Sequence, residues 1–261
     1  MNINSENYNG ETPISTALLL AAGTGSRLFP LTKNAPKCLT LVNEKSILER
    51  LLANLKQQGF KRLVVITGYK KEGIMDFLGN QSGDMHIEYI HSPLYRTTNN
   101  IYSLWMARNI IKEPFVLLES DLVLETSLLN EMVYPDKMAV AKMEPWLNGT
   151  TVSVNKQNVV TQFQPGATED YRDVRYKTVN IYSFSVASWK AIVKKLNQYI
   201  SEGSVNCYYE TVFSEMVKNK EFFLEAVSFD KHAWYEIDTI HDLAEAEKLF
   251  PIQVLEGSLQ E

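Results

Sequence analysis

The hydrophobic residues in the first half of the chain form short runs separated by stretches with helical spacing. The runs lack polar alternation, which is typical of strands buried on both faces of a sheet: they are 16–22, 63–67 and 115–118. Helical patterns occupy 46–58, the region around 74–78, and 99–110, and residues 86–90 alternate like a further strand. This succession of strands and helices predicts a parallel sheet covered by helices.

The second half changes character, because strand-like segments follow one another with only turn residues between them. These segments are 137–143, 151–154, 159–163 and 178–184. Two helical patterns (187–201 and 208–218), a short strand (234–237) and a final helix (239–249) complete the pattern. We therefore expect an α/β fold with one domain, a Rossmann-like mixed sheet flanked by helices, over residues 16–250. Residues 1–15 are expected to form a flexible arm and residues 251–261 a C-terminal tail.

Composition and charge narrow the classes of function. The net charge of −5 argues against a general nucleic-acid binder. The longest apolar run, 17–22, is far shorter than the ~20 residues that span a bilayer, so no membrane insertion is expected. A polar N-terminus without an apolar signal core, together with only two cysteines, predicts a cytoplasmic protein. Residues 17–71 nevertheless hold ten Lys and Arg against two Glu, which indicates a local site for an anion such as a phosphate.

The strongest chemical signal is the loop after the first strand, LAAGTGSRLFPLTKNAPK, which runs from Leu20 to Lys37. Gly23 and Gly25 allow the backbone to approach a phosphate, and neighbouring N–H groups can line an anion-binding nest. Arg27 offers a bidentate fork for phosphate oxygens, and Lys37 offers a mobile point charge. The loop matches neither the dinucleotide fingerprint nor the Walker A sequence, because it lacks the third glycine of the former and the GK[ST] of the latter.

This loop resembles the signature of nucleotidyltransferases that make nucleotide-activated metabolites, a family that includes sugar-phosphate nucleotidylyltransferases and bacterial phosphocholine cytidylyltransferases. The matching pattern is GxGSR-L-x-P-L-T-x4-K after a strand that ends LAAG. TNNIYSL at 98–104 and WYEIDT at 234–239 resemble the phosphocholine and aminoethylphosphonate cytidylyltransferase branch more than the hexose branch. The resemblance implies a nucleotide-diphospho-sugar transferase-like fold, with a nucleotide-binding half at about 16–125 and an acceptor-binding half at about 126–250.

The implied reaction joins CTP to a small phosphorylated or phosphonate amine and releases pyrophosphate, with Mg²⁺ as cofactor. Phosphocholine is the first expectation for the acceptor, followed by 2-aminoethylphosphonate and then a hexose 1-phosphate. A catalytically silent nucleotide-binding module is the rival outside the enzymes, and the oligomeric state is left open. By resemblance, Asp121 and Asp238 are the metal ligands; the alternative is that they are turn or helix-capping residues. Arg27 and Lys37 are assigned to charge stabilisation around the phosphates, as catalytic residues.

Two further groups of candidate residues surround this chemistry. Nucleotide recognition is expected from the loop and from two later segments, with helix capping as the alternative for the asparagines: Leu20, Ala21, Ala22, Gly23, Thr24, Gly25, Ser26, Gly68, Tyr69, Asn99, Asn100 and Ser103. Aromatic and acidic residues of the second half can form a box for a substituted ammonium group, or can simply pack in the core, and a lysine can bind the acceptor's phosphate: Trp146, Lys177, Tyr182, Tyr209, Glu210, Trp234 and Glu236.

Overall fold

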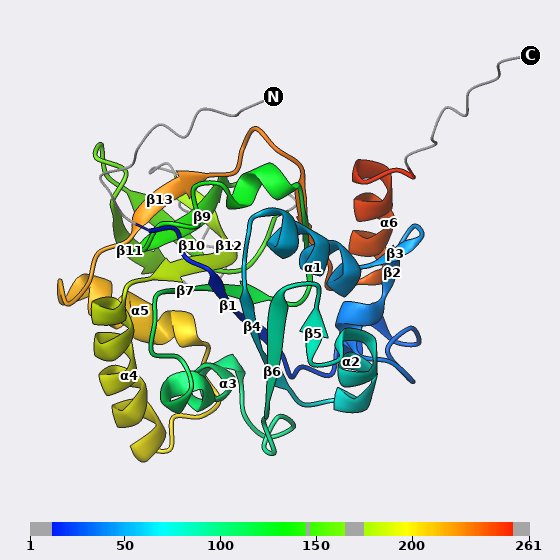
Figure 1. Cartoon of the computed structure of the whole chain (residues 1–261). Helices are drawn as coiled ribbons and strands as arrows, with labels where there is room; N and C mark the ends of the chain where they lie inside the picture. The colour runs from blue at the N-terminus through cyan, green and yellow to red at the C-terminus, as the bar shows by residue number, and fades with distance from the viewer. Residues whose placement is uncertain (1–11, 145–146, 165–174, 253–261) are drawn as a thin grey trace, which may run out of the picture.

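A computed structural model of the chain describes residues 12–144, 147–164 and 175–252. Within these residues a mixed ten-stranded sheet forms the centre of the molecule, in the strand order β11-β10-β12-β7-β1-β4-β6-β5, with β9 beside β12 and β13 beside β9 (Figure 1). The strands are β1 (Thr16–Ala21), β4 (Arg62–Thr67), β5 (Gln81–Ser82), β6 (Met85–His91), β7 (Phe115–Glu119), β9 (Lys137–Lys142), β10 (Thr151–Val154), β11 (Val160–Gln164), β12 (Arg175–Phe184) and β13 (Glu225–Ser228). The expected α/β fold with a mixed sheet is thereby confirmed.

The parallel part of the sheet consists of β7, β1, β4 and β6, which pair in register along their lengths. Their carboxyl ends therefore lie at one edge, where open α/β sheets bind ligands. Strand β12 joins this part in the antiparallel direction through β7. Its first residues also pair with β10, and β9 pairs with it at both ends. Its register shifts between Thr178 and Tyr182, and Asn180 within that shift has a left-handed backbone with φ of 61°.

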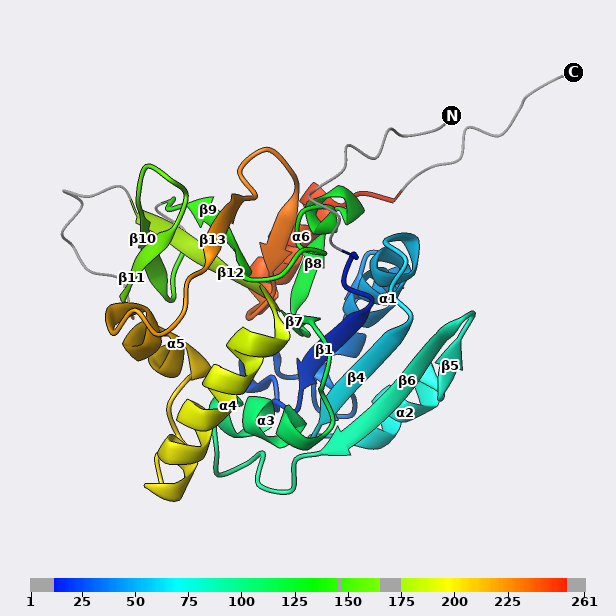
Figure 2. The same cartoon turned by 60° about the vertical axis from the view of Figure 1, so that its left-hand side comes forward.

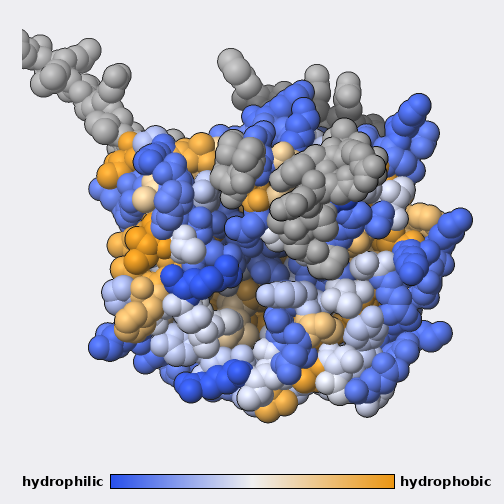
Figure 3. All heavy atoms as spheres, turned by 180° about the vertical axis from the view of Figure 1, so that it is seen from behind, coloured by the Kyte–Doolittle hydropathy of each residue, from blue (hydrophilic) through white to orange (hydrophobic). Residues whose placement is uncertain are grey.

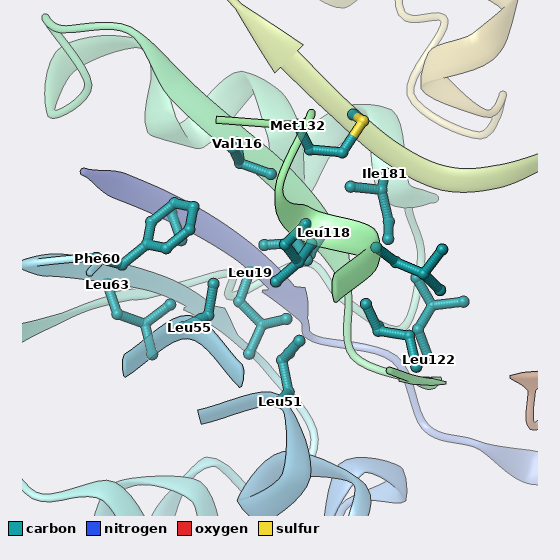
Figure 4. Close-up of a cluster of buried hydrophobic side chains, with 14 of the residues drawn as sticks. Leu19, Leu51, Leu55, Phe60, Leu63, Val116, Leu118, Leu122, Met132 and Ile181 are labelled. Carbon is teal, nitrogen blue, oxygen red and sulfur yellow. The ribbon is translucent and has the colours of Figure 1, made fainter. Parts of the chain in front are cut away.

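Helices cover both faces of the sheet (Figures 1 and 2). Two helices pack on one face, α1 (Ile47–Gln57) and α2 (Lys71–Leu78), and three pack on the other, α3 (Asn100–Met106), α4 (Val186–Ser201) and α5 (Tyr209–Lys218). Alternate residues of β1 point to the two layers, since Leu19 packs with the first and Leu18 with the second. Figure 4 shows the first layer, in which Leu51 and Leu55 of α1 lie against Leu19.

Two small sheets and a last helix lie beside the main sheet. Strands β8 (Leu122–Leu124) and β14 (Trp234–Glu236) pair with each other, and β2 (Leu41–Val42) forms a hairpin with β3 (Lys45–Ser46). Helix α6 (Ile240–Leu249) packs here, where its Ala246 joins a third cluster with Leu28, Val42 and Ile237. The sequence patterns did not predict β2, β3, β5, β8, β13 or the short 3-10 helices, while the α-helices and the other strands match the expected segments within a few residues.

The expected arm at 1–15 and tail at 251–261 lie almost wholly outside the described residues, and the domain boundaries stay predictions. None of the helices in the described segments is long and apolar enough to cross a membrane.

Candidate active site

In the loop after β1, Gly25 packs closely against Lys37 and helps to position it. Gly25 has φ of 61°, a left-handed backbone that glycine adopts without strain. A Cβ on Gly25 would lie 2.9 Å from Lys37 Cβ and 3.0 Å from Thr32 Cγ2, so the position also lacks room for a side chain. The Thr32 hydroxyl donates to the Gly25 carbonyl at 2.9 Å and closes the loop. At Gly23, by contrast, a Cβ would meet nothing within 4 Å, which leaves this backbone open to a ligand.

Strands β8 and β14 bring Asp121 and Asp238 together. Asp121 directly precedes β8, and Asp238 follows β14 by two residues. The antiparallel register aligns Glu236 with Leu122, and the backbone N–H of Ile237 donates to the Asp121 carbonyl at 2.9 Å. The two aspartates, far apart in the sequence, therefore become neighbours through a pairing of only three residues on each side.

Helix α6 holds Asp238 without using its carboxylate. Thr239 is the N-cap, and its side chain and that of Asp242 form a reciprocal capping box. Asp242 Oδ2 also accepts from the backbone N–H of Asp238 at 3.0 Å. Thr239, and not Asp238, therefore caps the helix, and the capping alternative for Asp238 does not hold.

Lys37 lies between the two aspartates. Its Nζ is 2.8 Å from Asp121 Oδ2 and 2.6 Å from Asp238 Oδ1, and Arg27 Nη2 lies 2.8 Å from the same Asp238 oxygen. Burial opposes the charge on Lys37, but the two carboxylates outweigh burial and raise the pKa of its ammonium above the usual value. Asp121 Oδ1 is buried and has no hydrogen-bond partner among the described residues. A buried carboxylate oxygen without a partner, beside a second carboxylate, is a donor set suited to a hard cation such as Mg²⁺.

A cavity of about 290 Å³ opens over these four charged residues. Most of the residues expected to bind the nucleotide line it: Leu20, Ala21, Ala22, Gly23, Gly25, Ser26, Asn99, Asn100 and Ser103. Thr24 is not among the lining residues. Gly68 and Tyr69 line a separate, shallower cavity of about 290 Å³ that shares Tyr95 with the first. Figure 3 shows the molecule from behind, where a hollow near the centre of the face has a mostly hydrophilic border.

The two asparagines at the start of α3 already have partners in the fold. Asn99 is the N-cap, and its side chain accepts from the backbone N–H of Asn100 at 2.8 Å. Asn100 Nδ2 donates to Glu119 at 3.1 Å, and its Oδ1 accepts from the backbone N–H of Tyr209 at 2.9 Å. Asn99 therefore takes up the capping role named as the alternative, and both side chains still border the cavity.

Glu119 lines the cavity, and two further carboxylates, Glu210 and Glu236, lie close enough to it to affect its charge. Burial, followed by the charge of Asp121, raises the pKa of Glu119 well above its usual value, and Tyr209 donates its hydroxyl to this carboxylate at 2.8 Å. Burial likewise raises the pKa of Glu210 to about 7 and raises that of Glu236. Lys177 lies 3.1 Å from Glu236 Oε2, and Asn180 Nδ2 donates to Glu236 Oε1 at 3.2 Å. The shift in β12 thus aims Asn180 at this group, as bulges beside functional sites often do.

The structure brings the expected acceptor residues together only in part. The cluster of carboxylates and their partners just described includes four of them: Lys177, Tyr209, Glu210 and Glu236. All but Glu236 are almost completely buried. Tyr182 is fully buried in the second core cluster, whereas Trp234 is half-buried and packs against the first. Trp146 lies outside the described residues.

Some residues that line the cavity escaped the analysis of the sequence: Pro36, Cys38, Tyr95, Thr98, Glu119 and Ser120. Glu119 is the most important of these, because it links Asn100, Tyr209 and Asp121. Its signal was available, since an acidic residue at the end of a buried parallel strand lies where ligands bind. No local pattern indicates Tyr95, which reaches the cavity from the loop after β6.

Comparisons with known proteins agree with this geometry. Residues 16–163 match the nucleotidyl transferase family. The chain is 30% identical over 94% of its length to CMP-5'-(3-aminopropyl)phosphonate synthase of Streptomyces rubellomurinus, and it spans 41% of that relative. It is 26% identical over 89% of its length to choline-phosphate cytidylyltransferase of Streptococcus pneumoniae and covers 97% of that protein.

The fold is similar to a solved structure of CTP:phosphocholine cytidylyltransferase from Streptococcus pneumoniae, with a TM-score of 0.79 and 22% identity, over 92% of this chain and all of the other. A UDP-glucose pyrophosphorylase matches with a TM-score of 0.76. The chain belongs to the nucleotidyl transferase family.

Proposed function

We propose that the protein is a cytidylyltransferase that joins CTP to a small phosphorylated or phosphonate amine, with release of pyrophosphate. The observation that carries this proposal is the meeting of Arg27, Lys37, Asp121 and Asp238 at one cavity, beneath the glycine loop. The names of two relatives, one acting on an aminoalkylphosphonate and one on choline phosphate, support CTP and an amine acceptor.

The reaction needs no nucleophilic side chain. An acceptor phosphate is largely dianionic at neutral pH, so its oxygen can attack the α-phosphorus of CTP in line and expel pyrophosphate. The work of the protein is to position two anions and to neutralise their charge. The open backbone at Gly23 suits the triphosphate, and the exposed Arg27 suits the leaving pyrophosphate. Lys37 suits the α-phosphate and the acceptor phosphate, because it lies deeper and bears its charge firmly.

Asp121 and Asp238 would hold Mg²⁺ in this scheme. The metal would supply charge neutralisation for the reacting phosphates. The unpartnered Asp121 Oδ1 supports this assignment, and so does the freedom of the Asp238 carboxylate from capping duty.

A panel of substrates tests the proposal. Pyrophosphate release is measured with CTP, UTP, ATP and GTP, each combined with phosphocholine, phosphoethanolamine, 2-aminoethylphosphonate and hexose 1-phosphates, with Mg²⁺ present. We expect CTP with an amine acceptor to give the highest rate, and Asp238→Asn to abolish most of it. A preference for a hexose phosphate would contradict the acceptor class, and a lack of turnover throughout would favour the silent module.

A further inference from the structure

Two cavities of the molecule meet at Tyr95. The first opens over the four charged residues and the second lies beside it, and each has a volume of about 290 Å³. Among the described residues, Tyr95 is the one that lines both cavities. It lies in the loop after β6 and is half-buried. Tyr95 therefore forms a partition between the two spaces.

Gly68 makes room for the side chain of Tyr95. A Cβ on Gly68 would lie 2.8 Å from both Cβ and Cγ of Tyr95, and 2.5 Å from the carbonyl oxygen of Ala22. The backbone N–H of Tyr69 donates to that same carbonyl oxygen at 3.1 Å. Because glycine has no side chain, the tyrosine packs directly on the backbone where the ends of β1 and β4 meet. The partition thus consists of this backbone and the Tyr95 side chain.

Neighbouring residues hold the Tyr95 ring in place. Arg96 Nε donates to the Tyr95 hydroxyl at 3.0 Å, and the guanidinium carbon of Arg96 lies 5.6 Å from the ring centre. The ring also packs against the second core cluster. The turn that carries it is fixed by the carbonyl of Leu94, which accepts from the backbone N–H groups of Thr97 at 2.9 Å and Thr98 at 3.0 Å. Tyr95 is therefore a fixed wall of the cavity.

Charge decides which end of the first cavity suits the base of a nucleotide. The phosphates and the metal ion belong with the charged residues at one end: Arg27, Lys37, Asp121 and Asp238. Asp121 follows β7, whereas Tyr95 follows β6. These strands are three spacings apart in the order β7-β1-β4-β6, and each spacing is ~4.8 Å. The uncharged base is therefore expected at the Tyr95 end.

We infer that Tyr95 makes the protein select a pyrimidine nucleotide, because its ring ends the space for the base and excludes the second ring of a purine. This inference rests on the proposed function and extends it to a residue that determines nucleotide specificity. Such a wall gives specificity through steric conflict with the wrong ligand. Removal of the side chain would join the second cavity to the first and leave room for a base of two rings.

Nucleotide binding to a series of variants tests the inference without any acceptor. Isothermal titration calorimetry gives Kd for CTP, UTP, ATP and GTP, each with Mg²⁺. We expect the wild type and Tyr95→Phe to bind CTP more tightly than ATP or GTP. Tyr95→Ala should lower this preference about tenfold or more, because the steric conflict with the purine is removed. Tyr95→Leu, which keeps an apolar side chain against the core cluster, should give an intermediate preference.

Two comparisons separate a steric wall from simple stacking of the base on the ring. Stacking on an aromatic ring stabilises every base, so its loss would weaken the binding of all four nucleotides alike. Loss of a wall instead changes the ratio of purine to pyrimidine binding and leaves the ratio of CTP to UTP unchanged, because both of these bases have one ring. The matched control is Tyr102→Ala, since Tyr102 is also half-buried and contacts Trp105 but lines neither of the two cavities.

The outcomes are distinguishable. Wild-type binding of ATP or GTP as tight as that of CTP would overturn the inference. So would a purine-to-pyrimidine ratio that stays constant in both Tyr95→Ala and Tyr95→Leu, or one that Tyr102→Ala changes equally. Selective binding of CTP without pyrophosphate release from any acceptor would overturn the proposed function and leave the role of Tyr95 intact.

Discussion

Arg27 is the most exposed charged residue of the catalytic group, with 66% of its side chain open to solvent. Its ion pair with Asp238 therefore contributes little to folding, because exposed pairs are screened by water. We expect Arg27→Ala to leave the thermal midpoint nearly unchanged. It should lower kcat/KM for CTP by an amount that corresponds to a loss of roughly 2–4 kcal/mol of transition-state stabilisation. Arg27→Lys should recover little of this loss, since the planar fork is absent.

Steady-state kinetics with varied CTP check this expectation, and Lys33→Ala is the control. Lys33 is an exposed cation of the same loop that does not line the cavity. Full activity in Arg27→Ala, or an equal loss in Lys33→Ala, would remove Arg27 from the mechanism.

Glu210 makes stability depend on pH in an uncommon direction. Burial raises the pKa of its carboxyl in the folded protein to about 7, above the ordinary value of 4.5. Between these two values the folded state binds more protons than the unfolded state, so the free energy of unfolding falls as pH rises from 4.5 towards 7. The shift corresponds to roughly 2–4 kcal/mol once the carboxyl is fully ionised.

Denaturant unfolding at pH 5 and pH 8 measures this effect. Glu210→Gln should gain stability at pH 8 and weaken the dependence on pH. Glu215→Gln should instead lose stability at pH 8. Hydrogen bonds from Lys195 and Tyr199 lower the pKa of Glu215, so its ionised form stabilises the fold. If Glu210→Gln is no more stable than the wild type at pH 8, ionisation of the Glu210 carboxyl does not lower the free energy of unfolding.

At the scale of elements, helix α6 connects helix capping with catalysis. Its capping box fixes the backbone on which Asp238 sits, through Thr239 and Asp242. Thr239→Ala should therefore cost about 1 kcal/mol of stability and also lower kcat, since the carboxylate loses its fixed position. Helix α4 offers the matched control, because Ser185 caps it away from the cavity, with its hydroxyl accepting from Ser188.

Ser185→Ala should cost a similar amount of stability without affecting turnover. Calorimetry and pyrophosphate release on both variants separate the two roles. If both variants retain full activity, the position of Asp238 does not depend on the cap.

The same elements show how far local patterns in the sequence lead. Helix α1 and strands β1, β4 and β7 were predictable, because uniform apolar runs and a helical stripe are local signals. Strands β2, β3 and β5 have two residues each, too few to show a period. The pairing of β8 with β14 joins segments far apart in the chain, and no local pattern encodes such a contact.

At the scale of the whole molecule, the residues of the catalytic group could be named from the sequence, because the loop after β1 carries a long motif. Their mutual contacts could not be named. Asn100 donates a hydrogen bond to Glu119, and Tyr209 of another helix donates its backbone N–H to Asn100. The burial of the aromatic rings depends on how α5 packs against β12. Packing between distant segments thus decided which of the expected acceptor residues lie together and which rings are buried in the core.

Lys37 has a further consequence for the order of events at the cavity. Its ammonium occupies the position between Asp121 and Asp238 and offsets one of their two charges, and Arg27 beside Asp238 supplies the second positive charge, so the two cations together take the place of a divalent ion. We therefore expect the resting protein to fold without Mg²⁺ and the metal to enter with the nucleotide, whose phosphates draw Lys37 away. Chelation should leave the thermal midpoint of the wild type unchanged. Lys37→Met should lower the thermal midpoint. Mg²⁺ alone should restore part of the loss, because the two carboxylates no longer have the ammonium between them and can bind the metal. Thermal denaturation without nucleotide measures these midpoints. If Mg²⁺ raises the midpoint of the wild type as much as that of Lys37→Met, the lysine does not compete with the ion.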